Sequence, residues 1–195
     1  MADKFLIVGL GNPGKQYEAT RHNIGFMALE TLSRRAGIAG KHDSKFKAIV
    51  GTGRHAGKQL ILAQPLTYMN LSGESVIKLL NYYDLGPDQL LVIYDEAALP
   101  FGKIRVRPSG SDAGQKGVRS IIQQLGGNQN FARLRIGIGS PPAPMAMPDF
   151  VLSKFGPDEQ KDLPKIIDAA LDAVECWMND GVEEAMTRYN GLQLS

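Results

Sequence analysis

A histidine, an aspartate and two asparagines could together carry out general-base chemistry on a carbonyl. His22 precedes a predicted helix, and Asp95 follows a buried apolar run. A neutral imidazole accepts a proton, and a carboxylate can hold the ring and stabilise the cation that forms. The amides of Asn12 and Asn70 can donate to a carbonyl or a developing oxyanion. No serine or cysteine stands in a nucleophile signature, so we expect water to be the nucleophile.

Each of these residues, taken alone, also has an ordinary structural interpretation. His22 could cap a helix, Asp95 could form a turn, and Asn70 could be an N-cap. The glycine motif at 9–14 (G-L-G-N-P-G) suggests a nucleotide site. That alternative is weak because residues 15–23 are almost wholly polar, where a dinucleotide fold needs a packed helix. The glycines are better explained by a sharp turn that exposes Asn12.

The elements that must position these side chains alternate along the chain. Short apolar runs predict strands, and apolar residues spaced by three and four predict helices. Gly37 should end the first helix, and residues 140–148, with four prolines, should form a loop. The predicted strands are 5–8, 45–52, 59–63, 90–94, 103–107 and 134–138, and the predicted helices are 24–36, 71–82, 118–125, 158–179 and a shorter one from 182.

This alternation predicts an α/β fold, with residues 1–195 forming a single-domain sandwich. We expect a mixed, mostly parallel sheet with helices on both sides. Functional groups in open α/β sheets gather at the carboxyl ends of the strands. Asn12, Asn70 and Asp95 all follow predicted strands, so the fold should bring them together.

The charge distribution suggests a polyanionic partner. Residues 103–135 hold seven basic residues and one acid, which is 7 − 1 = +6, so the rest of the chain carries 2 − 6 = −4. A basic patch on an acidic body attracts nucleic acid, although a solvated surface is the plainer alternative. Its seven basic residues are Lys103, Arg105, Arg107, Lys116, Arg119, Arg133 and Arg135.

The remaining composition indicates a cytoplasmic protein. The single cysteine, Cys176, allows no internal disulfide, which fits a reducing compartment. The first apolar stretch is too short for a signal peptide, and no apolar run approaches the ~20 residues of a membrane helix. No His/Cys/Asp/Glu cluster has metal-ligand spacing, so we expect neither a metal nor another cofactor.

Several motifs, in the same order over nearly the whole chain, resemble the bacterial peptidyl-tRNA hydrolase family. Each is more extended than a single short pattern, and they agree with one another. They are F-L-I-V-G-L-G-N-P-G-x-x-Y-x-x-T-R-H-N-x-G (5–25), P-x-T-Y-M-N-x-S-G (65–73), V-I-Y-D-E (92–96), L-P-x-G-x-I-R-x-R (99–107) and N-F-x-R-L-R-I-G-I-G (130–139).

The resemblance implies an ester hydrolase that releases peptide from peptidyl-tRNA and so recycles tRNA from stalled or aborted translation. It implies that His22 is the catalytic base and that Asp95 orients it. The family's two asparagines, which hold the substrate carbonyl and water, match Asn12 and Asn70. We expect no membrane contact and no obligate protein partner, hence a monomer. Other matching positions are the pocket residues Tyr17, Tyr68 and Met69, and the tRNA-binding residues Lys103, Arg105, Arg107 and Arg135.

The chain departs from the family at one segment. Where the family usually has G-G-H-N-G, with an asparagine that binds substrate, residues 113–117 read A-G-Q-K-G. Lysine donates hydrogen bonds but cannot accept them, and it adds a charge. We expect Lys116 to take over a substrate-binding role. The alternative is a hydrolase-derived RNA-binding protein that does not cleave.

Overall fold

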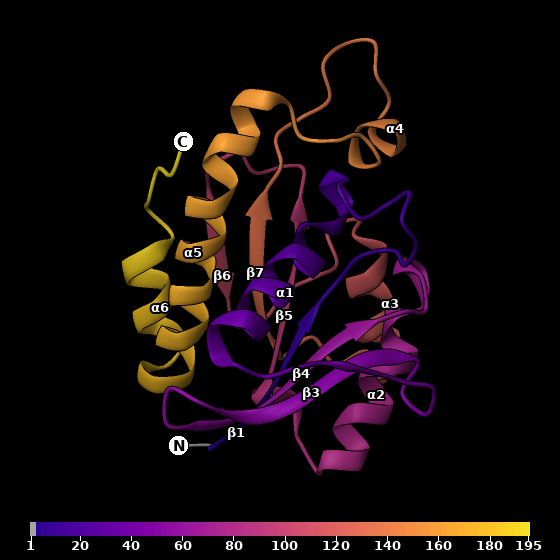
Figure 1. Cartoon of the computed structure of the whole chain (residues 1–195), viewed down its shortest axis with the longest axis vertical. Coiled ribbons are helices and arrows are strands. Elements are labelled where there is room, and N and C mark those ends of the chain that lie inside the picture. The colour runs from indigo at the N-terminus through magenta and orange to yellow at the C-terminus, as the bar shows by residue number, and fades with distance from the viewer. Residues whose placement is uncertain (1–2) are drawn as a thin grey trace.

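A seven-stranded mixed sheet forms the centre of the computed structural model, which describes residues 3–195 (Figure 1). The strands lie in the order β2-β3-β4-β1-β5-β7-β6. Their bounds are β1 (Lys4–Gly9), β2 (Lys41–Asp43), β3 (Ala48–His55), β4 (Lys58–Pro65), β5 (Leu90–Glu96), β6 (Ile104–Arg107) and β7 (Ala132–Gly137).

The centre of the sheet is parallel and its edges are antiparallel. β1 pairs in parallel with both β4 and β5, and β5 pairs in parallel with β7. The edge pairs β2–β3, β3–β4 and β6–β7 are antiparallel. The carboxyl ends of β1, β4 and β5 therefore meet along one edge of the sheet, which is where α/β folds place their sites.

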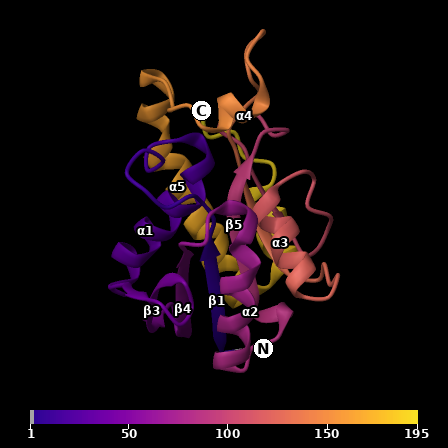
Figure 2. The same ribbon diagram turned by 90° about the vertical axis from the view of Figure 1, so that its right-hand side faces the viewer.

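Helices cover both faces of the sheet, which confirms the predicted α/β sandwich. Figure 2 shows α1 and α5 on one side and α2 and α3 on the other. The helices are α1 (Ile24–Ala36), α2 (Ser72–Tyr83), α3 (Lys116–Gln124), α4 (Met147–Val151), α5 (Pro157–Asp180) and α6 (Val182–Tyr189), with 3-10 turns η1 (Arg21–Asn23), η2 (Met69–Leu71) and η3 (Pro87–Gln89).

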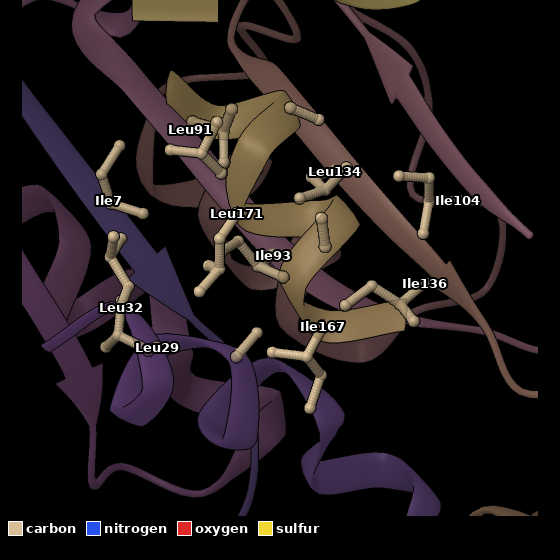
Figure 3. Close-up of a cluster of buried hydrophobic side chains, with 14 of the residues drawn as sticks. Ile7, Leu29, Leu32, Leu91, Ile93, Ile104, Leu134, Ile136, Ile167 and Leu171 are labelled. Carbon is tan, nitrogen blue, oxygen red and sulfur yellow. The ribbon is translucent and has the colours of Figure 1, made fainter. Parts of the chain in front are cut away.

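Two buried apolar clusters hold these layers together. Strand residues alternate between them, so Ile7 and Ile93 face α1 and α5, while Leu6 and Val92 face α2 and α3. Figure 3 shows the first cluster, in which α5 lays Ile167 and neighbouring residues against the strands. Because both faces of the central strands are covered, these strands are continuous apolar runs, as expected for buried parallel strands.

A close approach at Gly25 fixes the start of α1 above the sheet. A Cβ at this position would lie 2.4 Å from the carbonyl oxygen of Ile93 and 2.6 Å from that of Leu10. Only glycine permits that contact. It holds the turn before α1, and with it His22, beside the end of β5. At its other end α1 stops at Gly37 in the left-handed conformation, φ 66°, as predicted.

The predicted elements are present with some shifted boundaries. Strand β3 begins and ends three residues later than predicted, and β4 extends beyond its predicted range at both ends, so the hairpin turn shrinks to Ala56 and Gly57. The loop of residues 140–148 ends earlier than predicted because α4 begins at Met147. The short strand β2 and helix α4 were not predicted. Within residues 3–195, no helix is long and apolar enough to cross a membrane.

Candidate functional site

A cleft of about 750 Å³ opens at the carboxyl ends of β1 and β5. Its other walls come from η2, the start of α3, and α4, which lies at the end of the molecule toward which the arrowhead of β7 points (Figure 1). The predicted catalytic and substrate-binding residues line this cleft with one exception, Tyr17. Those present are Asn12, His22, Tyr68, Met69, Asn70, Asp95 and Lys116.

His22 and Asp95 form a close pair inside the cleft. Nδ1 of His22 lies 2.7 Å from Oδ2 of Asp95, and the two side chains are 15% and 4% exposed. Because an ionised carboxylate only accepts hydrogen bonds, Nδ1 must carry the proton that joins them. In the neutral ring the lone pair then lies on Nε2. The pair therefore presents a base whose tautomer the aspartate determines.

Asn12 is held so that one end of its amide is left for a ligand. Its Oδ1 accepts a hydrogen bond from the Met69 backbone N–H at 2.8 Å. The side chain of the buried Asn23 makes two hydrogen bonds to the Asn12 backbone. Its Oδ1 accepts from the Asn12 N–H at 2.8 Å, and its Nδ2 donates to the Asn12 carbonyl at 2.9 Å. With Oδ1 occupied, Asn12 offers the N–H groups of Nδ2 to the cleft. Donors of this kind suit a carbonyl oxygen.

The segment after β4 presents Tyr68 and Asn70 in an unusual backbone conformation. Tyr68 has φ 60° and ψ 158°, a region that only glycine adopts easily and that costs on the order of 1–3 kcal/mol. Tyr68 remains 54% exposed at the cleft. Asn70 is also exposed, one turn position after the buried Met69. Stored backbone strain of this kind is characteristic of functional sites.

The segment that departs from the family's usual sequence lies against the His22–Asp95 pair. The amide nitrogen of Gln115 donates to Asp95 Oδ1 at 3.3 Å and to the sulfur of Met69 at 3.1 Å. Its Oε1 accepts from the Val118 N–H at 2.9 Å, which caps α3. Lys116 is exposed at the first position of α3 and lines the cleft.

Tyr17 does not reach the cleft lining. Its backbone forms the turn before η1, in which its carbonyl accepts from both the N–H and the hydroxyl of Thr20. The tyrosine is half-buried in this turn. Its predicted pocket role is therefore not supported by a place in the cleft, and it stays a prediction.

Four arginines share one face of the β6–β7 pair. Arg105 lies opposite Arg135, and Arg107 lies opposite Arg133. Arg133 is fully buried and donates to three carbonyl oxygens, so it supports the strand from within. Burial first, and then the charges of Arg105 and Arg135, lower the pKa of Arg107 below its ordinary value. Arginine nonetheless stays charged, and a phosphate would relieve this crowding.

The predicted tRNA-binding residues differ in exposure and in how many contacts their side chains make. Arg135 is only 17% exposed, with Nε on the Tyr94 hydroxyl at 3.1 Å and Nη1 3.7 Å from Glu96. Glu96 lines the cleft, so its contact with Arg135 links the basic face to the cleft. Arg105 and Lys103 are partly exposed on the edge of the sheet.

Arg21 ties the turn that carries His22 to the opposite wall of the cleft. Its guanidinium makes a two-pronged ion pair with Glu159, both contacts at 2.7 Å. It also stacks over the rings of Phe150 and Phe155, at 4.6 and 4.9 Å from their centres. Because Phe150 belongs to α4, this side chain helps to hold His22 near that wall, together with the backbone bond from Arg21 N–H to the Ser153 carbonyl at 2.9 Å.

Sequence reasoning missed several residues that shape the site. Asn23 stands beside His22 in the T-R-H-N motif, but the sequence alone assigned it no role. Gln115 was noted only as a departure from the family. The α4 wall has no local motif. Its lining residues are Met147, Pro148, Val151 and Leu152. No group of three or more His, Cys, Asp or Glu side chains in residues 3–195 could hold a metal ion.

Comparison with known proteins agrees with this geometry. The model of the family described as "Peptidyl-tRNA hydrolase" matches residues 6–195. The peptidyl-tRNA hydrolase of Gloeobacter violaceus is 52% identical over 95% of this chain and 93% of its own length, and that of Clostridium acetobutylicum is 44% identical over 97% and 100%. The crystal structure of the Acinetobacter baumannii peptidyl-tRNA hydrolase superposes with a TM-score of 0.93 at 39% identity, covering 100% of this chain and 98% of that one. This chain therefore belongs to the peptidyl-tRNA hydrolase family.

Proposed function

We propose that this chain hydrolyses the ester bond between peptide and tRNA by general-base catalysis at the His22–Asp95 pair. The reaction would recycle tRNA from stalled or aborted translation in the cytoplasm. The observation that carries this proposal is the 2.7 Å contact between His22 Nδ1 and Asp95 Oδ2 in a cleft of substrate size.

In the first step a water molecule attacks the ester carbonyl carbon. His22 Nε2 takes a proton from the water, and Asp95 stabilises the imidazolium that forms. The carbonyl oxygen becomes an oxyanion, to which Asn12 Nδ2 and the Asn70 amide can donate. When the tetrahedral intermediate collapses, the imidazolium returns the proton to the departing ribose oxygen. The products are a peptide with a free carboxyl group and a tRNA with a free terminal hydroxyl.

In this proposal the phosphates of the tRNA are bound by Lys103, Arg105, Arg107 and Arg135. Arg105 is the most direct contact, because no hydrogen bond or ion pair within residues 3–195 engages its side chain. Arg107 lies on the same strand, Lys103 directly precedes it, and Arg135 contacts Glu96 at the cleft. Phosphate contacts position a nucleic acid without reading its sequence.

We expect Arg105→Gln to weaken binding of every tRNA to a similar degree. Losing one phosphate contact should lower the slope of log affinity against log salt by about 1 or less. Fluorescence titration with several tRNAs at a series of salt concentrations measures both quantities. Arg34→Gln, an exposed arginine on α1, is the matched control. Weakening confined to one tRNA species would contradict a phosphate role for Arg105.

We expect Lys116→Asn to change substrate affinity more than turnover. Lys116 is exposed in the cleft, where its ammonium can meet a phosphate or carbonyl oxygen of the substrate. Asparagine keeps a donor but loses the charge, so KM should rise while kcat changes little. Steady-state kinetics with peptidyl-tRNA gives both constants. If the wild type does not cleave peptidyl-tRNA and Lys116→Asn does, the wild type is instead a non-cleaving RNA-binding protein.

A further inference from the structure

We propose that Gln115 is a positioning residue for Asp95, and that its side-chain amide fixes the carboxylate in the orientation that serves His22. This inference rests on the general-base function proposed above. It gives a catalytic purpose to a residue at which the chain departs from the family's usual segment.

Both oxygens of the Asp95 carboxylate are engaged by side chains. Oδ2 lies 2.7 Å from His22 Nδ1, and Oδ1 accepts from Gln115 Nε2 at 3.3 Å. The Asp95 side chain is only 4% exposed. A carboxylate that loses water on burial needs protein donors in its place. Gln115 supplies the donor for the oxygen that His22 does not contact, and so prevents the carboxylate from rotating away.

The hydrogen-bonding pattern allows one orientation of the Gln115 amide. Its Oε1 faces the N–H of Val118 at 2.9 Å, and its nitrogen faces acceptors, Asp95 Oδ1 and the sulfur of Met69. Turning the amide over would set oxygen against carboxylate and N–H against N–H. The cap of α3 therefore aims the N–H groups of Gln115 at Asp95.

Gln115 also links the catalytic pair to the substrate-binding asparagine. Its second N–H points to the sulfur of Met69 at 3.1 Å, and the Met69 backbone N–H binds Asn12 at 2.8 Å. One glutamine thus connects α3, β5 and η2 at the floor of the cleft. The charged groups that share this cleft are Glu96, next to Asp95 on β5, and Lys116, next to Gln115 on α3.

The test is Gln115→Glu, assayed with peptidyl-tRNA over a range of pH. Glutamate has the same length and can still accept from Val118, so the cap of α3 should be retained, while the second carboxylate beside the buried Asp95 should lower the thermal midpoint. An ionised carboxylate cannot donate to Asp95, and kcat should fall about tenfold to a hundredfold with KM little changed. The added negative charge favours the imidazolium of His22, so the acidic limb of the pH–kcat profile should move to higher pH.

Two further variants separate positioning from charge and from folding. Gln115→Met keeps the volume without donor or charge, and it should lower kcat without the same movement of the acidic limb. Gln123→Glu adds the same charge on the exposed side of α3 and should behave as wild type. Wild-type kcat and pH profile in both Gln115 variants would overturn the proposal, as would losses of kcat that only follow losses of folded protein by circular dichroism.

The wild type and His22→Ala are assayed alongside, so that failure of the proposed function can be distinguished from failure of the role proposed for Gln115. If the wild type cleaves, His22→Ala does not, and both Gln115 variants are unaffected, only the role of Gln115 is wrong. If the wild type does not cleave peptidyl-tRNA, the proposed function and this inference fail together.

Discussion

Replacing His22 with alanine is expected to lower kcat for peptidyl-tRNA hydrolysis by about 10²–10⁴-fold, the usual contribution of a general base. The substitution removes the imidazole that takes the proton of the attacking water in the proposed mechanism. The arginine-bearing strand β6 is untouched, so affinity for tRNA should change little. Single-turnover hydrolysis gives the rate, and titration with uncharged tRNA gives the affinity.

His42→Ala is the matched control for this loss. His42 is exposed on the edge strand β2, outside the cleft lining, and its removal should leave turnover unchanged. A His22→Ala protein with near-wild-type turnover would show that another group activates the water.

Asp95→Asn is expected to have the second largest effect, a fall in kcat of about 10²–10⁴-fold. Asparagine has no charge to stabilise the imidazolium. The structure adds a second reason, because Gln115 donates to Oδ1 of Asp95, the oxygen that His22 does not contact. The asparagine oxygen would turn to that donor and present its NH₂ to His22. The ring would then carry its proton on Nε2 and could not accept one from water.

The nuclear magnetic resonance signals of the His22 ring in Asp95→Asn report the tautomer directly. We expect Nε2–H in the variant and Nδ1–H in the wild type. Unchanged kcat together with an unchanged tautomer would mean that Asp95 only fills space beneath the histidine.

The sequence could predict the pairing of His22 with Asp95 because both follow strong local signals. Asp95 ends an apolar run that is buried on both faces, and His22 precedes a helix with clear periodicity and a glycine stop at Gly37. Parallel strands bring such ends to one edge of the sheet. Local pattern was therefore sufficient to place Asn12 and Asn70 at this edge as well.

Other parts of the site depend on contacts between distant segments. Arg133 and Arg135 alternate identically in the sequence, yet Arg133 is fully buried, with its guanidinium bound to backbone carbonyls of Ser111 and Gln129, while Arg135 contacts Glu96 at the cleft. The Gln115–Asp95 contact spans 20 residues and follows from how α3 docks. Helix α4 has only five residues, too few for a periodic pattern, and Arg21, far away in the sequence, packs over its Phe150. The sequence therefore does not predict this helix.

The central claim, that this chain activates water to attack the ester carbonyl of peptidyl-tRNA, is tested most directly by one turnover in heavy-oxygen water. Excess enzyme is mixed with peptidyl-tRNA, and both products are examined by mass spectrometry. We predict cleavage, with one heavy oxygen in the new peptide carboxyl group and none in the terminal ribose of the tRNA. Label in the ribose, or an unlabelled peptide with label in an enzyme carboxylate, would contradict the mechanism, and tight tRNA binding without any cleavage would contradict the enzyme itself.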